Sequence, residues 1–173
     1  MVSKRVMTDQ LVLSVGYDRE SLQNEEIRRN YKGEILRDHY GREVPKYAHG
    51  TTNLKGHSNT SSEIITAVME LYDHIVDPSL LVRRITIAAN HIKAEEKLVK
   101  EVKFEQLDLF SDAAEEEKRR QKEKEKKDKE RNLQEAILHI HSKYGKNSLL
   151  KGSNFVDGAT MKDRNQQIGG HRA

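Results

Sequence analysis

The sequence contains no cysteine and no tryptophan, and aromatic residues make up only 5% of its 173 positions. Without cysteine, a disulfide framework and thiolate metal sites are excluded. With so few aromatic side chains, we expect no large stacking surface for single-stranded nucleic acid. No segment approaches the roughly 18–20 apolar residues of a membrane span, and residues 1–5 lead into no apolar core of a secretory signal. These features favour a cytoplasmic protein.

Charge is abundant where apolar side chains are scarce. Charged residues make up 34% of the chain and apolar residues 35%, and the mean hydropathy is −0.87. This composition is too polar for one compact core along the whole length, so we expect a small folded unit and a long exposed part. The net charge of +3 and the pI of 9.0 permit contact with nucleic acid without requiring it.

The first half of the chain predicts strands separated by a long loop. Leu11, Leu13, Val15 and Tyr17 alternate with other residues, which predicts a half-buried strand over residues 10–17. Residues 18–45 are polar and rich in turn residues, and they predict a long loop. Residues 46–54 predict a weaker strand, because Gly50 interrupts it.

A helix and a third strand follow. Thr60-Ser61-Ser62-Glu63 fits a capping box, in which the Thr60 hydroxyl accepts an amide hydrogen of the first turn. Apolar residues then recur at helical spacing until Asp77-Pro78 ends the helix. Residues 81–92 alternate and predict a strand. We expect three of its side chains to face inward (Ile85, Ile87, Ala89) and three to face outward (Arg84, Thr86, Asn90).

The second half of the chain predicts a connector, a helix and a tail. Residues 93–111 form the connector, and residues 112–145 form one long charged helix that ends at Gly145. Residues 146–173 predict an irregular tail. Residues 1–92 thus order as strand-strand-helix-strand, and the fold class is α+β.

The motif QLDLF, residues Gln106, Leu107, Asp108, Leu109 and Phe110, places large apolar side chains just before the charged helix. One interpretation is a short edge strand or loop whose leucines close the small domain. The other is a peptide that docks into a partner's groove by its apolar anchors, with the Gln106 amide bonding to the groove. Asp108 favours the second, because a buried carboxylate needs a partner.

A resemblance extends this second interpretation. QLDLF resembles the pentapeptide by which bacterial proteins bind the sliding clamp. Other stretches resemble, in order, the C-terminal region of UmuC-like, Y-family translesion DNA polymerases of Gram-positive bacteria: TDQLVLSVGY, KYAHGTTNL, TSSEIITAVMELYDHIVDPSLLVRRITIAANHI and KYGKNSLLKGSNFVDGATMKDRNQQIGGHRA. The resemblance covers nearly the whole chain and implies a role in DNA repair after DNA damage, in the SOS response.

The resemblance implies that residues 1–92 are a truncated little-finger domain, which lacks the family's first strand and first helix. The open face of such a sheet lies on DNA and contacts backbone phosphates. The implied contacts are Arg83 and Arg84 on the last strand, with Lys46, His49, Thr51 and Thr52 on the preceding strand. The alternative for Arg83 and Arg84 is that they are solvated charges on an exposed face.

Catalytic and metal-binding patterns are missing from the sequence. The family's palm, fingers and thumb, which carry its metal-binding carboxylates, are absent. Consecutive acids such as Glu115, Glu116 and Glu117 diverge on a helix, and Asp73 and Asp77 suggest solvated groups at a helix end. The eight histidines show no ligand spacing. We therefore expect no enzyme activity, no cofactor and no metal.

Two functional hypotheses follow from the sequence. In the first, the chain is an accessory fragment of translesion synthesis that binds damaged DNA through the sheet and the sliding clamp through Gln106–Phe110. A separate catalytic polymerase part is a further partner in this hypothesis. In the second, the chain is a clamp-tethered adaptor without DNA contact, or a non-functional remnant of a polymerase gene. Steep salt dependence distinguishes DNA binding from docking of an apolar peptide.

Overall fold

A computed structural model describes residues 1–98, 113–168 and 171–172 of the chain. These residues divide into two compact units, the first ending before residue 105 and the second containing residues 113–172. The first unit has an antiparallel sheet with a helix on it, and the second has a long helix, so the α+β class is confirmed. No helix among the described residues is both long and apolar enough to cross a membrane.

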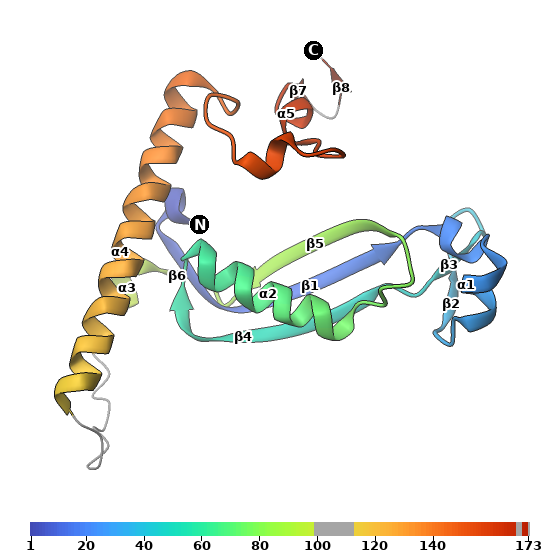
Figure 1. The fold of residues 1–173 in the computed structure, drawn as a ribbon, viewed down its shortest axis with the longest axis horizontal. Helices are drawn as coiled ribbons and strands as arrows, with labels where there is room; N and C mark the ends of the chain where they lie inside the picture. Colours follow the sequence, from blue (N-terminus) through green and yellow to red (C-terminus); the bar gives the residue numbers. More distant parts are fainter. Residues whose placement is uncertain (99–112, 169–170, 173) are drawn as a thin grey trace. The chain divides into compact units, whose positions relative to one another are not determined.

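The sheet of the first unit is built around its longest strand. After a short 3-10 turn, η1 (Val2–Lys4), the strand β1 (Val6–Tyr17) pairs antiparallel with β4 (Ala48–Ser58) on one side and β5 (Val82–Asn90) on the other. The short strand β6 (Lys93–Ala94) pairs with the start of β1. Helix α2 (Ser61–Ile75) lies along one face of this sheet (Figure 1).

The core lies between β1 and α2. Leu11, Leu13 and Val15 are almost completely buried, and they pack with Val68 of α2 and with Leu80. This confirms the predicted alternation, because successive side chains of a strand point to opposite faces. The strand begins at Val6 rather than at residue 10, since Val6 and Met7 pair with β6.

Gly50 is a point of close approach between β4 and α2. A Cβ atom at this position would lie 2.9 Å from Cδ1 of Leu71 and 3.3 Å from two side-chain carbons of Ile75. The glycine that weakened the strand pattern in the sequence therefore serves the packing, because its missing side chain lets the helix approach the strand.

The prediction that the Thr60 hydroxyl caps the start of α2 is wrong. Thr60 occupies the N-cap position, but its side chain makes no capping hydrogen bond. Instead, its backbone N–H donates to Oγ of Ser58, at 3.1 Å. The prediction failed because Ser58, at the end of the preceding strand, fixes the turn into the helix.

The long loop predicted for residues 18–45 is also wrong, since this segment folds into what we call the small lobe. It contains η2 (Arg19–Leu22), α1 (Glu25–Asn30), β2 (Ile35–Arg37) and β3 (Glu43–Pro45), and the last two form an antiparallel hairpin. Local caps start its helical turns: Asp18 accepts from the amide of Glu20, and Asn24 from that of Glu26.

The small lobe is attached to the sheet close to the start of β5. The amide of Asp18 donates to the carbonyl of Leu81 at 2.7 Å, and the amide of Leu81 donates to Oγ of the buried Ser21 at 2.9 Å. Leu22 and Pro45 are buried as well. Burial of these residues supplies stabilisation that the short elements lack by themselves.

The first part of the predicted connector belongs to the first unit. Residues 93–94 form β6, and α3 (Glu95–Leu98) follows directly, with the amide of Glu95 donating to the carbonyl of Arg5. The prediction of a connector over residues 93–98 is therefore wrong. The rest of the connector, including Gln106–Phe110, lies outside the described residues.

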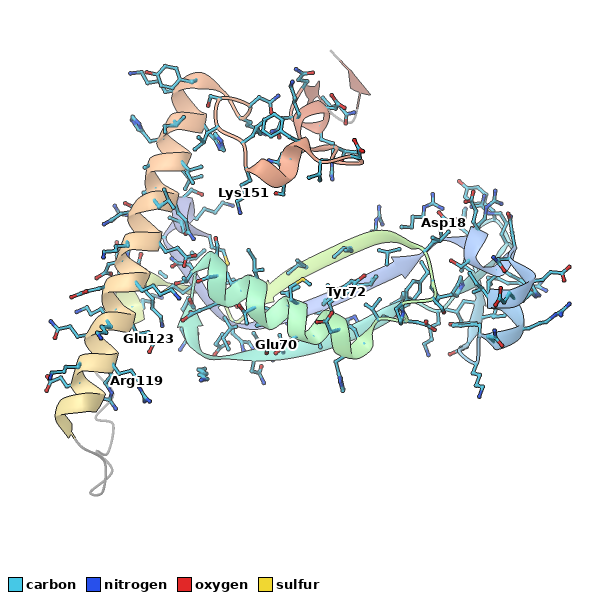
Figure 2. All side chains as sticks on the ribbon, in the orientation of Figure 1. Asp18, Glu70, Tyr72, Arg119, Glu123 and Lys151 are labelled. Atoms are coloured by element: carbon cyan, nitrogen blue, oxygen red, sulfur yellow. The ribbon has the colours of Figure 1, made fainter. Side chains whose placement is uncertain are left out.

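The second unit begins with the predicted helix. Helix α4 (Ala113–Tyr144) ends as expected at Gly145, which has a φ of 90° and donates its amide hydrogen to the carbonyl of His141. Charged side chains such as Arg119 and Glu123 project from it (Figure 2). The tail has four short elements: η3 (Gly152–Phe155), α5 (Met161–Arg164), and the paired strands β7 (Gln167–Ile168) and β8 (His171–Arg172).

Candidate nucleic-acid interface

The sheet has an open face on the side opposite α2. In each of the three long strands, every second side chain points to this face, and the strand register aligns these side chains across the sheet. The residues on this face are polar or small. They are Gln10, Val12, Ser14 and Gly16 of β1, His49, Thr51 and Asn53 of β4, and Arg84, Thr86, Ala88 and Asn90 of β5. We call this surface the open face.

Hydrogen bonds across the strands order the polar side chains of the open face. Nε2 of Gln10 donates to Oδ1 of Asn53, and Nδ2 of Asn90 donates to Oε1 of Gln10, both at 3.0 Å. Farther along, Oγ of Ser14 lies 2.8 Å from Nδ1 of His49. The face therefore presents fixed hydrogen-bonding groups rather than an apolar surface.

Of the three DNA contacts predicted on β4, two lie on the open face and one does not. His49 and Thr51 are exposed on the open face, as the prediction requires. Thr52 pairs with Leu11 and shares the face that α2 covers, because a strand alternates with a period of two. Thr52 therefore does not join the other predicted contacts.

The predicted contact Lys46 precedes β4 and already has an acidic partner. Its Nζ lies 2.6 Å from Oε2 of Glu34, at the base of the small lobe. This hydrogen bond and the charge of the carboxylate raise the pKa of Lys46. Because its charge is compensated within the chain, Lys46 is a weaker candidate for a phosphate than an unpaired cation.

Arg83 and Arg84 lie at a β-bulge. Gly16 pairs with Arg84 and Tyr17 pairs with Val82, so that Arg83 is an extra residue with no partner on β1. Bulges commonly change the direction of a side chain beside a binding site. Both arginines are exposed and line one hollow together with Gly16 and Tyr17. The bulge thus brings two cations to one place at the end of the open face.

Charge compensation distinguishes these arginines from others in the first unit. Arg28 pairs with Glu43, Arg29 with Glu25, and Arg42 with Asp38, at N–O distances of 2.8, 3.0 and 2.7 Å. In the part of the chain that the structure describes, no carboxylate pairs with Arg83 or Arg84. Their guanidinium groups keep all their donors for an external anion.

The inward residues of β5 differ from the prediction. Ile85 and Ile87 pair with Val15 and Leu13 and share the α2 side of the sheet, as expected, but they are 53% and 51% exposed. Helix α2 packs over β4 and β1 and leaves β5 uncovered. The prediction gave the direction of these side chains correctly and their burial wrongly.

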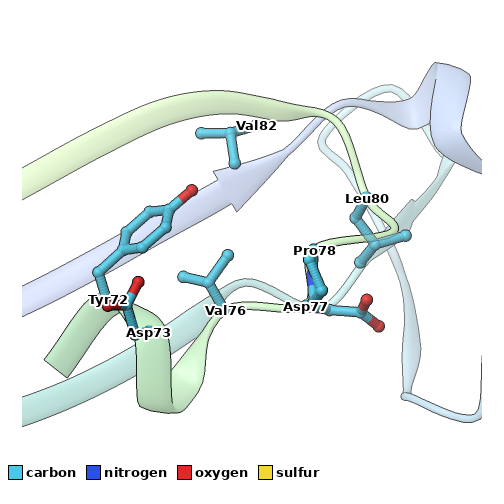
Figure 3. Close-up of a pocket in the computed structure, with 7 residues that line it drawn as sticks. All are labelled: Tyr72, Asp73, Val76, Asp77, Pro78, Leu80 and Val82. Carbon is cyan, nitrogen blue, oxygen red and sulfur yellow. The ribbon is translucent and has the colours of Figure 1, made fainter. Parts of the chain in front are cut away.

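One flank of α2 continues this uncovered surface. Ile65, Met69, Tyr72 and Val76 share a flank by helical spacing. Figure 3 shows Tyr72 and Val76 lining a hollow with Val82, the first residue of β5. Ile65 and Met69 are 53% and 50% exposed. We call Ile65, Met69, Ile85 and Ile87 the apolar ledge.

Asp77 and Asp9 of the first unit take part in local structure. Oδ1 of Asp77 accepts from the amide and the hydroxyl of Ser79. Oδ1 of Asp9 lies 2.9 Å from Nδ1 of His91, and Oδ2 of Asp9 lies 3.5 Å from Nε2 of His57. Within residues 1–98, 113–168 and 171–172, no three His, Asp or Glu side chains are arranged to hold a metal ion.

The carboxyl of Asp38, in the small lobe, gives a prediction for pH. Hydrogen bonds from the side chain of Arg42, and from the amides of Arg42 and Tyr40, lower the pKa of Asp38 to about 2. Because this pKa is below its usual value, the stabilisation is present above about pH 4 and is lost as pH falls towards 2. Carboxyl NMR shifts should show this titration, and Arg42→Met should move it upward.

The matched control for this measurement is Arg29→Met, which removes the exposed ion pair with Glu25 in the same lobe. It should leave the titration of Asp38 unchanged. If Asp38 titrates at its ordinary value in the unmodified chain, the hydrogen bonds around its carboxylate do not persist in solution.

Comparisons with known proteins give no match to a family model, a curated protein or a solved structure. The functional assignment therefore depends on the residues of the chain itself. The UmuC-like resemblance and the clamp-binding peptide stay predictions.

Proposed function

We propose that the first unit binds DNA through its phosphate backbone, with Arg83 and Arg84 as the principal contacts. The observation that carries this proposal is the pair of uncompensated arginines at the β-bulge, beside Gly16 at the end of the open face. Guanidinium groups bind phosphate oxygens with two parallel hydrogen bonds. Two such groups in one place match successive charges along a nucleic-acid strand.

The rest of the open face supports contacts that do not depend on base sequence. His49, Thr51 and Ser14 offer short polar groups on a flat surface, and such groups hydrogen-bond to phosphate and sugar oxygens. Phosphate contacts fix the position of a protein on DNA without reading bases. This suits a protein that follows DNA through any sequence.

We place this DNA binding in translesion synthesis, with no catalytic centre in the chain. The resemblance of most of the sequence to UmuC-like polymerases supports this role. In the same proposal, Gln106–Phe110 binds the bacterial sliding clamp and holds the chain near primer ends, in the cytoplasm. Leu107, Leu109 and Phe110 would fill the clamp's groove.

The apolar ledge supports a further partner, namely a separate catalytic part of the polymerase. Clustered apolar side chains that stay half-exposed on a folded unit commonly mark a surface for protein association. Ile85 and Ile87 face the side of the sheet on which α2 packs, so a helix laid along β5 next to α2 could cover the four residues of the ledge.

Reversing the charge of the two arginines tests the proposed DNA binding. Arg83→Glu/Arg84→Glu should weaken binding to a fluorescently labelled duplex by roughly 10- to 100-fold in an anisotropy titration. The plot of log affinity against log salt concentration should also become shallower by about 2, because two fewer phosphates are neutralised.

Arg28→Glu/Arg29→Glu is the matched control, since it makes the same change of charge at ion-paired residues. Equal losses in both double variants would show only a nonspecific effect of net charge. A chain that binds the clamp but has no measurable affinity for DNA is the adaptor of the second hypothesis, and a chain that binds neither is a remnant.

A further inference from the structure

The hairpin of the small lobe ends in a well-fixed turn, residues 38–42. Strands β2 and β3 pair up to Arg37 and Glu43, and the amide of Asp38 donates to the carbonyl of Arg42 at 2.9 Å. Gly41 has a φ of 73°, a conformation that favours glycine. Its amide donates to the carbonyl of Asp38, so the backbone of the turn is closed at both ends.

The carboxylate of Asp38 holds the turn from inside. Its Oδ1 accepts from the amides of Tyr40 and Arg42 at 2.9 and 3.0 Å, and its Oδ2 accepts from Nε of Arg42 at 2.8 Å. The backbone that carries Tyr40 therefore has a fixed position before any ligand arrives. Fixing a binding group in advance lowers the entropic cost of association.

Tyr40 is the group that this turn presents. It is 77% exposed, although the guanidinium carbon of Arg42 lies 4.7 Å from its ring centroid and the His39 ring stands edge-on at 5.4 Å. Arg37, Arg42 and His39 place cationic or ionisable groups on the same turn. Because Asp38 neutralises the charge of Arg42, the remaining positive charge of the turn comes from Arg37.

The composition of the turn favours a nucleobase over an apolar protein surface. Residues 37–42 read RDHYGR, so the turn itself offers Tyr40 no aliphatic side chain with which to form an apolar patch. A solitary aromatic ring among cations is instead typical of sites that stack a base and attract its phosphates. The turn needs no large aromatic surface for this role, only one ring.

The start of the small lobe is hydrogen-bonded to the segment that leads into the two arginines of the β-bulge. Asp18 and Ser21, at the start of the lobe, hydrogen-bond to Leu81, two residues before Arg83. We propose that Tyr40 stacks on an unpaired nucleobase of the DNA whose backbone Arg83 and Arg84 hold. This inference rests on the proposed function and adds a preference for DNA with a single-stranded segment.

Tyr40→Ala tests the stacking site with two DNA molecules, a blunt duplex and a duplex with a single-stranded overhang that has the same number of phosphates. Affinity for the overhang DNA should fall by about 5- to 150-fold, and affinity for the blunt duplex should change less than twofold. Tyr40→Phe keeps the ring and should behave like the unmodified chain. Equal losses on both DNA molecules, or no loss, would overturn the proposal.

Tyr40→Trp gives an independent measurement, because the chain contains no other tryptophan. Its fluorescence should be quenched by the overhang DNA and not by the blunt duplex. DNA binding that depends on Arg83 and Arg84 but leaves this tryptophan unquenched would refute the stacking site alone. If neither DNA binds, the proposed function fails and the stacking site fails with it.

Discussion

Leu13→Ala is expected to lower the free energy of unfolding by about 2–5 kcal/mol. Leu13 is completely buried at the centre of β1, where it packs beneath α2. Among the described residues of the first unit, α2 is the helix that packs on this sheet, so its surroundings offer few side chains to fill the resulting cavity. Since small domains have total stabilities of about 5–15 kcal/mol, the loss is a large fraction of the whole. Urea denaturation followed by circular dichroism measures it.

Val12→Ala is the matched control for this experiment. Val12 directly precedes Leu13 in the same strand, but it lies on the open face and is only partly buried. Its truncation should cost clearly less than that of Leu13. If the two variants are equally stable, β1 does not keep the observed direction of its side chains in solution.

Leu109→Ala/Phe110→Ala is expected to abolish the proposed binding to the bacterial sliding clamp. Apolar anchors at the centre of a peptide-binding groove commonly contribute about 2 kcal/mol or more each. Loss of both should therefore reduce the affinity about a thousandfold. Surface plasmon resonance with immobilised clamp measures this change, and added salt should affect the unmodified interaction little, since its anchors are apolar.

Glu105→Ala provides the control, because Glu105 directly precedes the motif and is not one of its anchors. It should retain most of the affinity for the clamp. Unchanged binding of the double variant would show that the pentapeptide is not the docking element, and the structural interpretation of its leucines would then be preferred.

The parts of the fold that were predictable have strong local patterns. The alternation of Leu11, Leu13 and Val15 gave β1 and its buried face correctly. Apolar spacing before Asp77-Pro78 gave α2, and Gly145 gave the end of α4. In each case, periodicity or a glycine with positive φ is visible in a single sequence.

The small lobe was missed because its elements have three to six residues and no periodic pattern. Their stability comes from tertiary burial of Leu22 and Pro45, which sequence does not display. The caps Asp18 and Asn24 were the available signal. Because the small lobe was not predicted, the fixed turn around Tyr40 could not be predicted either.

The candidate site was only partly predictable for a related reason. The sequence indicated Arg83 and Arg84, but the bulge that places both beside Gly16 depends on strand register. Register also decides that Thr52 faces the helix while Thr51 does not. The partner of Lys46 is Glu34, which lies in the segment interpreted as a loop.

The outer edge of β5 has a consequence for the behaviour of the chain at high concentration. Strand β5 is hydrogen-bonded to β1 along one side. Among the described residues, no strand pairs with its other side. An unpaired edge with isoleucines on one face invites strand-to-strand aggregation between molecules. Arg83 and Arg84 stand on that same edge and act as gatekeepers by mutual repulsion. Glutamate at both positions would preserve this protection, whereas alanine would remove it and confound a binding assay with precipitation.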